Sequence, residues 1–203
     1  TWCMPSWGVR IVDRHKLSLD KNYVLVSNHQ SQLDILVLYR LLFPYRWVSK
    51  VAVFRLPFIG WNMRINGAIK LRRGDKASIT AMMDRCETLL KQNISIFFFP
   101  EGTRSKDGRL RPFKPGAFIL AKNARVPIQP IVLNHTRNAL PKYSLIIQGR
   151  HDMEVKVLDE VPYERFKDME PLEIADMVRK IIGAHVHEMG ELAPDERLSQ
   201  ESA

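Results

Sequence analysis

Short apolar runs of strand length alternate with longer amphipathic runs along most of the chain. The clearest strand pattern covers residues 94–99, which are apolar apart from Ser95 and are followed by Pro100. The clearest helix pattern covers residues 76–90, where apolar side chains recur three and four positions apart. Strands that alternate with helices favour an α/β domain. We therefore expect α/β architecture, with a mixed, largely parallel central sheet flanked by helices.

The chain length of 203 residues fits a single domain. Further strands are expected at residues 23–26, 46–49, 67–71, 128–133, 144–147 and 154–158, and further helices at residues 35–43, 117–124 and 171–188. We place the domain at residues 21–190, after an N-terminal stub of residues 1–20 and before a polar tail of residues 191–203. No apolar run reaches the roughly 20 residues of a spanning helix, although a membrane-anchoring segment can precede Thr1.

The chain has a formal net charge of +9. A basic surface favours anionic partners such as nucleic acid, acidic lipid headgroups or phosphorylated carriers. No nucleic-acid-reading motif accompanies the charge, so we expect no nucleic-acid partner. The two cysteines, Cys3 and Cys86, form no C-x-x-C pair, which favours a reducing, cytoplasmic setting. We interpret Cys86 as a small buried hydrophobe, and we predict no metal site, because the histidines have no ligand partners at recognisable spacing.

Residues 28–34 read Asn-His-Gln-Ser-Gln-Leu-Asp and join an expected strand to an expected helix. His29 then lies at the carboxyl end of a strand, where open α/β sheets bind ligands. If Asp34 holds one imidazole nitrogen, the other can take a proton from a hydroxyl, which is typically worth about 10²–10⁴ in rate. The same spacing fits a capping box in which Ser31 caps the helix and Asp34 reaches back. The spacing by itself leaves both interpretations open.

A nucleophile on the protein is not indicated. The chain contains no G-x-S-x-G elbow, which argues against a serine hydrolase of the α/β-hydrolase type. Ser27 and Ser31 flank His29 without a distinctive context. We therefore expect the attacking group to be a hydroxyl of the substrate itself.

A second polar segment, Phe-Pro-Glu-Gly-Thr-Arg-Ser at residues 99–105, follows the clearest strand. Gly102 permits close approach of a ligand to the backbone, and Arg104 offers a planar fork suited to phosphate. Further cations follow at Lys106, Arg109, Arg111 and Lys114. The alternative is an ordinary solvated basic loop.

Three further segments each allow two interpretations. In the strand expected at residues 67–71, Arg73 follows on the face of Ile69 and Leu71, which makes it either a phosphate ligand or an ordinary strand-end cation. The two prolines within residues 126–131 fit either the wall of an acyl groove or plain core. Residues 51–63 mix apolar and basic side chains, which suits either a membrane-interfacial surface or core with a charged flank.

Taken together, residues 28–34, 67–73, 99–105 and 126–131 resemble, in order, the four sequence blocks of the glycerophospholipid acyltransferase family, and in particular of 1-acyl-sn-glycerol-3-phosphate acyltransferases. The resemblance runs from about residue 8 to about residue 161. It implies that His29 is a general base and that Asp34 orients it. It further implies that Arg73, Glu101, Gly102, Thr103 and Arg104 bind the phosphate and glycerol part of an acceptor. Lys70 departs from the family pattern, which usually has an aromatic or aliphatic residue there.

The resemblance also implies an activity and a setting. The chain would transfer a fatty acyl group from acyl-CoA or an acylated carrier protein to the sn-2 hydroxyl of lysophosphatidic acid, giving phosphatidic acid. It would need no cofactor other than the acyl donor. It would work on a membrane surface with anionic lipids, at the cytoplasmic face, or at the inner membrane if bacterial. Two alternatives remain open: another lysolipid or glycerol 3-phosphate as acceptor, and a basic peripheral membrane-binding protein without turnover.

Overall fold

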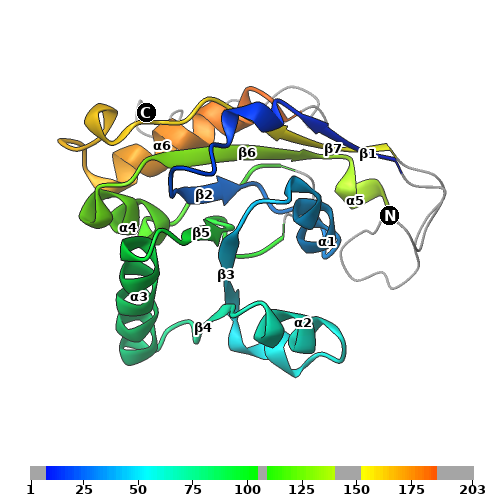
Figure 1. Ribbon diagram of the computed structural model, residues 1–203, viewed down its shortest axis with the longest axis horizontal. Coiled ribbons are helices and arrows are strands. Elements are labelled where there is room, and N and C mark those ends of the chain that lie inside the picture. Colours follow the sequence, from blue (N-terminus) through cyan, green and yellow to red (C-terminus); the bar gives the residue numbers. More distant parts are fainter. Residues whose placement is uncertain (1–7, 105–108, 140–151, 187–203) are drawn as a thin grey trace, which may run out of the picture.

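The computed structural model describes residues 8–104, 109–139 and 152–186, and it shows one sheet with helices on both faces (Figure 1). The seven strands are β1 (Gly8–Val12), β2 (Val24–Ser27), β3 (Tyr45–Lys50), β4 (Ile69–Leu71), β5 (Ser95–Phe98), β6 (Ile128–Asn134) and β7 (Asp152–Val157). Their order in the sheet is β1-β7-β6-β2-β5-β3-β4. Only the β6–β7 pair is antiparallel among the described strands. The expected mixed, largely parallel α/β sheet is therefore confirmed.

The α-helices are α1 (Asp34–Leu38), α2 (Ile59–Ile65), α3 (Lys76–Lys91), α4 (Gly116–Ala124), α5 (Thr136–Ala139) and α6 (Pro171–Gly183). Short 3-10 turns are η1 (Arg14–Lys16), η2 (Tyr39–Leu41), η3 (Val51–Arg55) and η4 (Tyr163–Arg165). Successive residues of β2 point to opposite faces. Val24 and Val26 pack with α3, α4 and α6, whereas Leu25 packs with α1, η3 and α2. A strand buried on both faces explains the continuous apolar runs.

Several elements differ from the expectations, and the helices α2 and α5 were not expected at all. Residues 8–12, expected to lie in an N-terminal stub, instead form β1 and pair in parallel with β7, so the expected domain boundary at residue 21 is too late. The helix expected at 35–43 ends at Leu38 and continues as the 3-10 turn η2. The helix expected at 171–188 ends at Gly183, while the strand expected at 144–147 lies outside the described residues.

The sheet brings several polar loops to one edge. Strands β2, β5, β3 and β4 are neighbours and all run parallel, so their carboxyl ends meet at the same edge of the sheet. The segments that follow β2, β5 and β4 carry His29, Glu101 and Arg73 respectively. These are three of the residues that the sequence analysis predicted as catalytic or substrate-binding. Within the part of the chain that the structure describes, no helix is both long enough and apolar enough to cross a membrane.

Candidate active site

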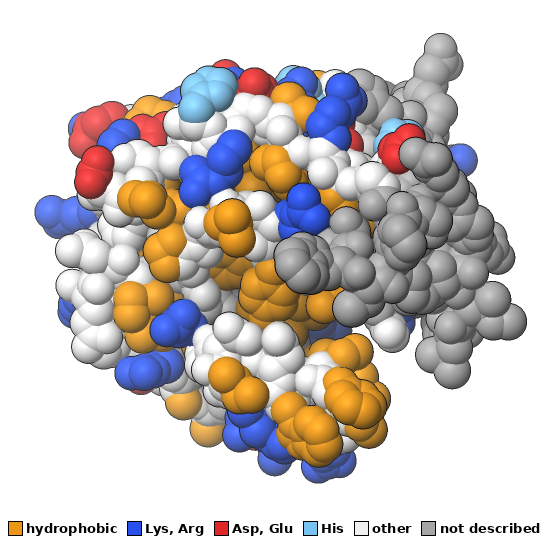
Figure 2. All heavy atoms as spheres, turned by 45° about the vertical axis from the view of Figure 1, so that its right-hand side comes forward, with side chains coloured by type: hydrophobic (Ala, Val, Ile, Leu, Met, Phe, Trp, Pro, Cys, Tyr) orange, Lys and Arg blue, Asp and Glu red, His pale blue; other side chains and the backbone are white. Residues whose placement is uncertain are grey.

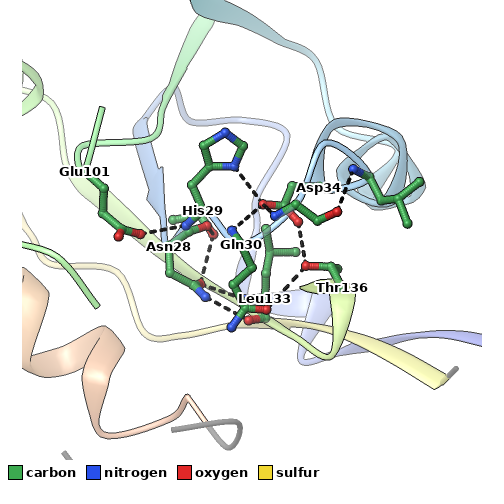
Figure 3. Close-up of polar contacts among 10 residues, drawn as sticks. Asn28, His29, Gln30, Asp34, Glu101, Leu133 and Thr136 are labelled. Carbon is green, nitrogen blue, oxygen red and sulfur yellow. Dashed lines mark hydrogen bonds and ion pairs between the residues drawn. The ribbon is translucent and has the colours of Figure 1, made fainter. Parts of the chain in front are cut away.

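The imidazole of His29 lies directly against the carboxylate of Asp34. Nδ1 of His29 is 2.8 Å from Oδ2 of Asp34, and the carboxylate is fully buried while the imidazole side chain is 18% exposed. Figure 3 shows the ring standing on the loop after β2 with Asp34 beneath it, at the start of α1. Because Nδ1 is engaged, Nε2 is the nitrogen that can meet a substrate proton. The expected hydrogen-bond reach between the two residues is confirmed.

Asp34 also holds the loop that carries His29. Its Oδ2 accepts backbone N–H groups from Gln30 at 2.8 Å and Ser31 at 3.0 Å. The Ser31 contact is one half of the capping box that the sequence suggested. The Ser31 hydroxyl accepts from the N–H of Leu33 at 3.3 Å, and the cap of α1 is Leu33 rather than Ser31. One carboxylate therefore both shapes the loop and orients the imidazole, and the two interpretations of the motif are compatible.

Two further side chains support the pair, and the sequence analysis assigned neither of them a role. Thr136, the first residue of α5, donates its hydroxyl to Oδ1 of Asp34 at 2.6 Å. The amide of Asn28 donates to the carbonyl of Leu133 and accepts from its N–H, both at 2.8 Å (Figure 3). This amide continues the β2–β6 pairing by one step, which lets the backbone leave the sheet at His29. Thr136 carries no local sequence signal, since it lies 102 residues from Asp34.

Glu101 is buried beneath the His29 loop rather than open to a ligand. One carboxylate oxygen accepts the backbone N–H of His29 at 2.7 Å, and the other accepts that of Arg111 at 3.1 Å. Burial raises the pKa of this carboxyl from 4.5 to about 7, while the two N–H donors oppose the shift and the Asp34 charge adds to it. The geometry therefore ties three segments together through Glu101.

An aromatic stack fixes the plane of the imidazole. The ring of Phe99 lies parallel to that of His29, with centroids 4.0 Å apart and an angle of 15° between the planes. Phe99 also stacks on Trp47 of β3, with ring centroids 5.5 Å apart. The ring of His29 is thus held by a carboxylate at one edge and by a packed aromatic ring over one face.

His29 forms one wall of a mostly apolar pocket of about 530 Å³. This volume is in the ordinary range for small-molecule sites, about 300–1,000 Å³. The pocket runs between the sheet edge and the α2 region, and it is lined by His29, Gln32, Leu33, Ile35, Leu36, Trp47, Val48, Ser49, Val53, Leu56, Phe58, Ile59, Asn62, Met63, Phe99 and Arg104. The imidazole of His29 therefore faces a cavity with mostly apolar walls.

The remaining residues suggested by the sequence lie at different distances from the imidazole. Arg104 lines the same pocket as His29. Gly102 has a φ of +70°, a left-handed conformation that favours glycine. Thr103, between them, is half-buried. Arg73 is exposed beyond β4, three strand spacings from β2, or roughly 14 Å at about 4.8 Å each.

The last of the four sequence blocks does not reach the pocket. Residues 126–131 lead into and form most of β6, whose side chains in this stretch are all buried apart from that of Pro127, so plain core describes them and none lines the pocket. Cys86 is buried, and burial raises the pKa of its thiol to about 12, as suits a hydrophobic core residue. Ser105 and Lys106 lie outside the described residues.

The sequence model of the acyltransferase family matches residues 8–134, which comprise β1 to β6 and every side chain of the site described above except Thr136. The chain belongs to the acyltransferase family. The match begins at the first residue of β1, which agrees with the place of that strand in the sheet. Thr136 lies two residues beyond the match.

Individual relatives of this chain carry a consistent name. The chain is 47% identical to a chloroplastic 1-acyl-sn-glycerol-3-phosphate acyltransferase from Brassica napus, over 68% of this chain and 40% of that protein. It is 35% identical to a 1-acyl-sn-glycerol-3-phosphate acyltransferase from Chlamydomonas reinhardtii, over 95% of this chain and 59% of that protein. The chain thus spans between two fifths and three fifths of the length of these relatives.

A solved structure has the same fold. The crystal structure of the 1-acyl-sn-glycerophosphate acyltransferase PlsC from Thermotoga maritima superposes with a TM-score of 0.77. The similarity covers 93% of this chain and 74% of that chain, at 24% sequence identity. The acyltransferase domain described here therefore has the PlsC fold.

Proposed function

We propose that this chain transfers an acyl group from an acyl thioester to the sn-2 hydroxyl of 1-acyl-glycerol 3-phosphate, giving phosphatidic acid. The observation that carries the proposal is the His29–Asp34 pair, 2.8 Å apart, at the wall of an apolar pocket that also includes Arg104. A base, an apolar cavity and a cation are the three features that this reaction needs. The names of the relatives supply the substrate class.

In the proposed reaction, Nε2 of His29 withdraws the proton of the acceptor hydroxyl as its oxygen attacks the thioester carbonyl. A new C–O ester bond forms, the C–S bond breaks, and the proton passes from His29 to the departing thiolate. The Asp34 carboxylate stabilises the imidazolium during the transfer. No side chain of the protein forms a covalent intermediate, in keeping with the lack of a serine elbow in the sequence.

The pocket suits an acyl chain, and Arg104 suits the acceptor phosphate. Arg104 lines the pocket together with His29, and a guanidinium can hold a phosphate through two parallel hydrogen bonds. Gly102 and Thr103 shape the turn before Arg104, and their backbone is our candidate for close approach of the glycerol. We give Glu101 a positioning role, because its two oxygens hold backbone N–H groups.

Arg73 is proposed to contribute to acceptor binding only through its long side chain or its charge. Arg73 is exposed at the end of β4, two strand spacings, or roughly 10 Å at about 4.8 Å each, from β5, which precedes Arg104, so direct sharing of one phosphate requires both arginine side chains to extend toward each other. Either acyl-CoA or an acylated carrier protein fits the proposal as donor. We also propose that the chain works on a membrane surface, at its cytoplasmic face.

Release of free thiol from acyl-CoA in the presence of lysophosphatidic acid tests the proposal. His29→Ala should lower kcat by about 10²–10⁴, while His15→Ala, which alters an exposed histidine of η1, serves as the matched control. Thermal unfolding of both variants checks that they fold. A folded His29→Ala protein with near-normal turnover would refute the mechanism.

The role of Arg104 is tested by kinetics. Loss of one charge-assisted contact to phosphate should cost about 1.5–3 kcal/mol, or roughly 10- to 150-fold in acceptor KM, with a smaller change in donor KM. Arg85→Ala, an exposed arginine on α3, is the control. Screening the wild-type chain against glycerol 3-phosphate and other lysolipids separates the alternative acceptors, and vesicle binding without thiol release would favour the non-catalytic alternative.

A further inference from the structure

One segment of the chain carries positive charges without any acidic residue. Residues 35–74 contain no Asp or Glu, and they contain eight cations: Arg40, Arg46, Lys50, Arg55, Arg64, Lys70, Arg72 and Arg73. The formal net charge of the whole chain is +9. The segment runs from α1 through β3, η3 and α2 to the end of β4 (Figure 1), so these elements carry eight positive charges that no acidic side chain of the same segment offsets.

The outer face of α2 exposes large apolar side chains within this basic segment. Phe58, Trp61 and Ile65 are 77%, 57% and 85% exposed, and we call these three residues the α2 cap. They follow one another at three- and four-residue spacing, so they share one face of the helix. Figure 2 shows hydrophobic side chains gathered at the lower right of the molecule with Lys and Arg side chains beside them. Large apolar side chains grouped in this way mark an interaction surface.

The opposite face of α2 packs firmly against the protein. Met63 is 1% exposed, and Gly60 is buried so closely that an added Cβ would lie 2.3 Å from the carbonyl oxygen of Phe54. The cap therefore stands on a compact base formed by η3 and α2. Its exposed residues are additional to those that this helix needs for folding.

The backbone at Phe58 is strained in a way that presents its ring outwards. Phe58 has φ 58° and ψ −54°, and the N–H of Ile59 donates to the carbonyl of Pro57 at 2.6 Å. These values describe a γ-turn of the rare positive-φ form, which is unfavourable for a bulky residue. The ring of Phe58 then meets that of Trp61 edge-on, with centroids 5.5 Å apart. Strain of this kind is typical of functional positions.

The cap is also continuous with the pocket at His29. Phe58 belongs both to the cap and to the pocket lining, and the nearby Leu56, which is 44% exposed, also lines the pocket. An apolar path therefore leads from the surface of α2 to the imidazole. A long acyl chain can follow this path without crossing open water.

We propose that the α2 cap is a docking surface for a lipid leaflet that contains anionic headgroups. The proposal deepens the acyltransferase function proposed above and rests on it for the route of the substrate. Phe58, Trp61 and Ile65 enter the interfacial layer, where aromatic side chains are favoured. Arg55 and Arg64, both exposed beside the cap, meet the anionic headgroups.

Two other occupants of this surface fit less well. A second copy of the chain would bring the same cations face to face, since a two-fold interface repeats one patch on both partners. An acidic protein would satisfy the cations, but it would leave no reason for Trp61 and Ile65 to be exposed together. A leaflet satisfies both the charges and the apolar cap.

Sedimentation of the 203-residue chain with vesicles tests the proposal. Vesicles of phosphatidylcholine alone are compared with vesicles that also contain phosphatidylglycerol. Trp61→Ser/Ile65→Ser should weaken binding by about 10-fold or more, because apolar side chains no longer enter the leaflet. Leu19→Ser/Leu172→Ser is the matched control, since these leucines are 68% and 65% exposed elsewhere on the protein.

The charges are tested separately. Arg55→Gln/Arg64→Gln should weaken binding to the anionic vesicles by roughly 5-fold for each charge removed, with little change for phosphatidylcholine alone. Arg85→Gln/Lys91→Gln, which removes two exposed cations of α3, is the control. Equal loss in both charge variants would mean that net charge alone drives binding, and it would overturn the assignment of the surface.

Activity separates this proposal from the function on which it rests. Trp61 and Ile65 do not line the pocket, so their double variant should transfer acyl groups normally to a short-chain, monomeric lysophosphatidic acid. His29→Ala should bind vesicles normally, with kcat lowered by about 10²–10⁴. Wild-type vesicle binding by Trp61→Ser/Ile65→Ser overturns the docking surface, whereas normal binding without thiol release by the wild-type chain overturns the acyltransferase function.

Discussion

Replacement of Asp34 by asparagine separates its structural from its chemical role. Oδ2 of Asp34 accepts from Nδ1 of His29 and from the N–H groups of Gln30 and Ser31, and Oδ1 accepts from the Thr136 hydroxyl at 2.6 Å. An asparagine side chain of the same shape keeps an oxygen at the first position. Its amide can donate to Thr136, whose hydroxyl rotates to accept. The loop should therefore keep its conformation.

Alanine at the same position should behave differently. It would remove the acceptor of four donors, and since the Thr136 hydroxyl can still donate to Oε1 of Gln30 at 3.3 Å, three are left without a partner. At about 1–3 kcal/mol each, the total loss is about 3–9 kcal/mol. This is a large part of the roughly 5–15 kcal/mol that stabilises a typical domain. Asp34→Asn instead keeps these hydrogen bonds but makes them weaker, because the charged carboxylate is replaced by a neutral amide. The replacement also removes the cost of burying a charge. Its free energy of unfolding should fall by only about 1–3 kcal/mol.

Asp34→Asn should affect catalysis much more than it affects stability. With Asp34→Asn the imidazolium loses its counter-charge, and kcat should fall by about 10²–10⁴ in a folded protein. Urea unfolding followed by tryptophan fluorescence gives the stability, and thiol release from acyl-CoA with lysophosphatidic acid gives kcat. Near-normal kcat for a folded Asp34→Asn protein would refute the orienting role and leave only the loop-shaping one.

Three other predictions concern single residues near the site or in the core. Burial raises the pKa of Glu101 from 4.5 to about 7, so this group favours the folded state below about pH 4.5. Its contribution of about 3 kcal/mol to the free energy of unfolding is lost as pH rises through about 7. Urea titrations across that pH range should show this loss of stability in the wild type and not in Glu101→Gln. Gly102→Ala should lower the free energy of unfolding by about 1–2 kcal/mol because φ is +70°, and an unchanged urea midpoint would contradict the strain. Burial raises the thiol pKa of Cys86 to about 12, so iodoacetamide at neutral pH should label its peptide only in urea, as read by mass spectrometry.

Local patterns in the sequence were sufficient for the elements and for the base. Short continuous apolar runs, and apolar side chains spaced three and four residues apart, depend only on neighbouring residues, so the strands β2, β5 and β6 and the helices α3 and α4 could be predicted without the fold. His29 and Asp34 are five residues apart, and their contact follows from one strand, one loop and one helical turn. The α/β class followed from the alternation of these elements.

The tertiary structure decided everything that depends on strand order. Nothing local places residues 8–12 beside β7, because β1 and β7 pair across more than a hundred residues. Thr136 reaches Asp34 for the same reason, through the neighbouring positions of β2 and β6. Glu101 was expected to bind substrate, but the close approach of β2 and β5 buries it against the N–H of His29.

The order of the strands also distinguishes Arg104 from Arg73, which the sequence analysis gave the same role. Arg104 follows β5, beside β2, and shares the pocket of His29, whereas Arg73 follows β4 at the far edge of the sheet. The sequence by itself determined which residues can carry the chemistry, because residue type and local period are written in it. Only the sheet decided which of them meet, because hydrogen bonding between distant strands sets their order and so the distances between the loops at their ends.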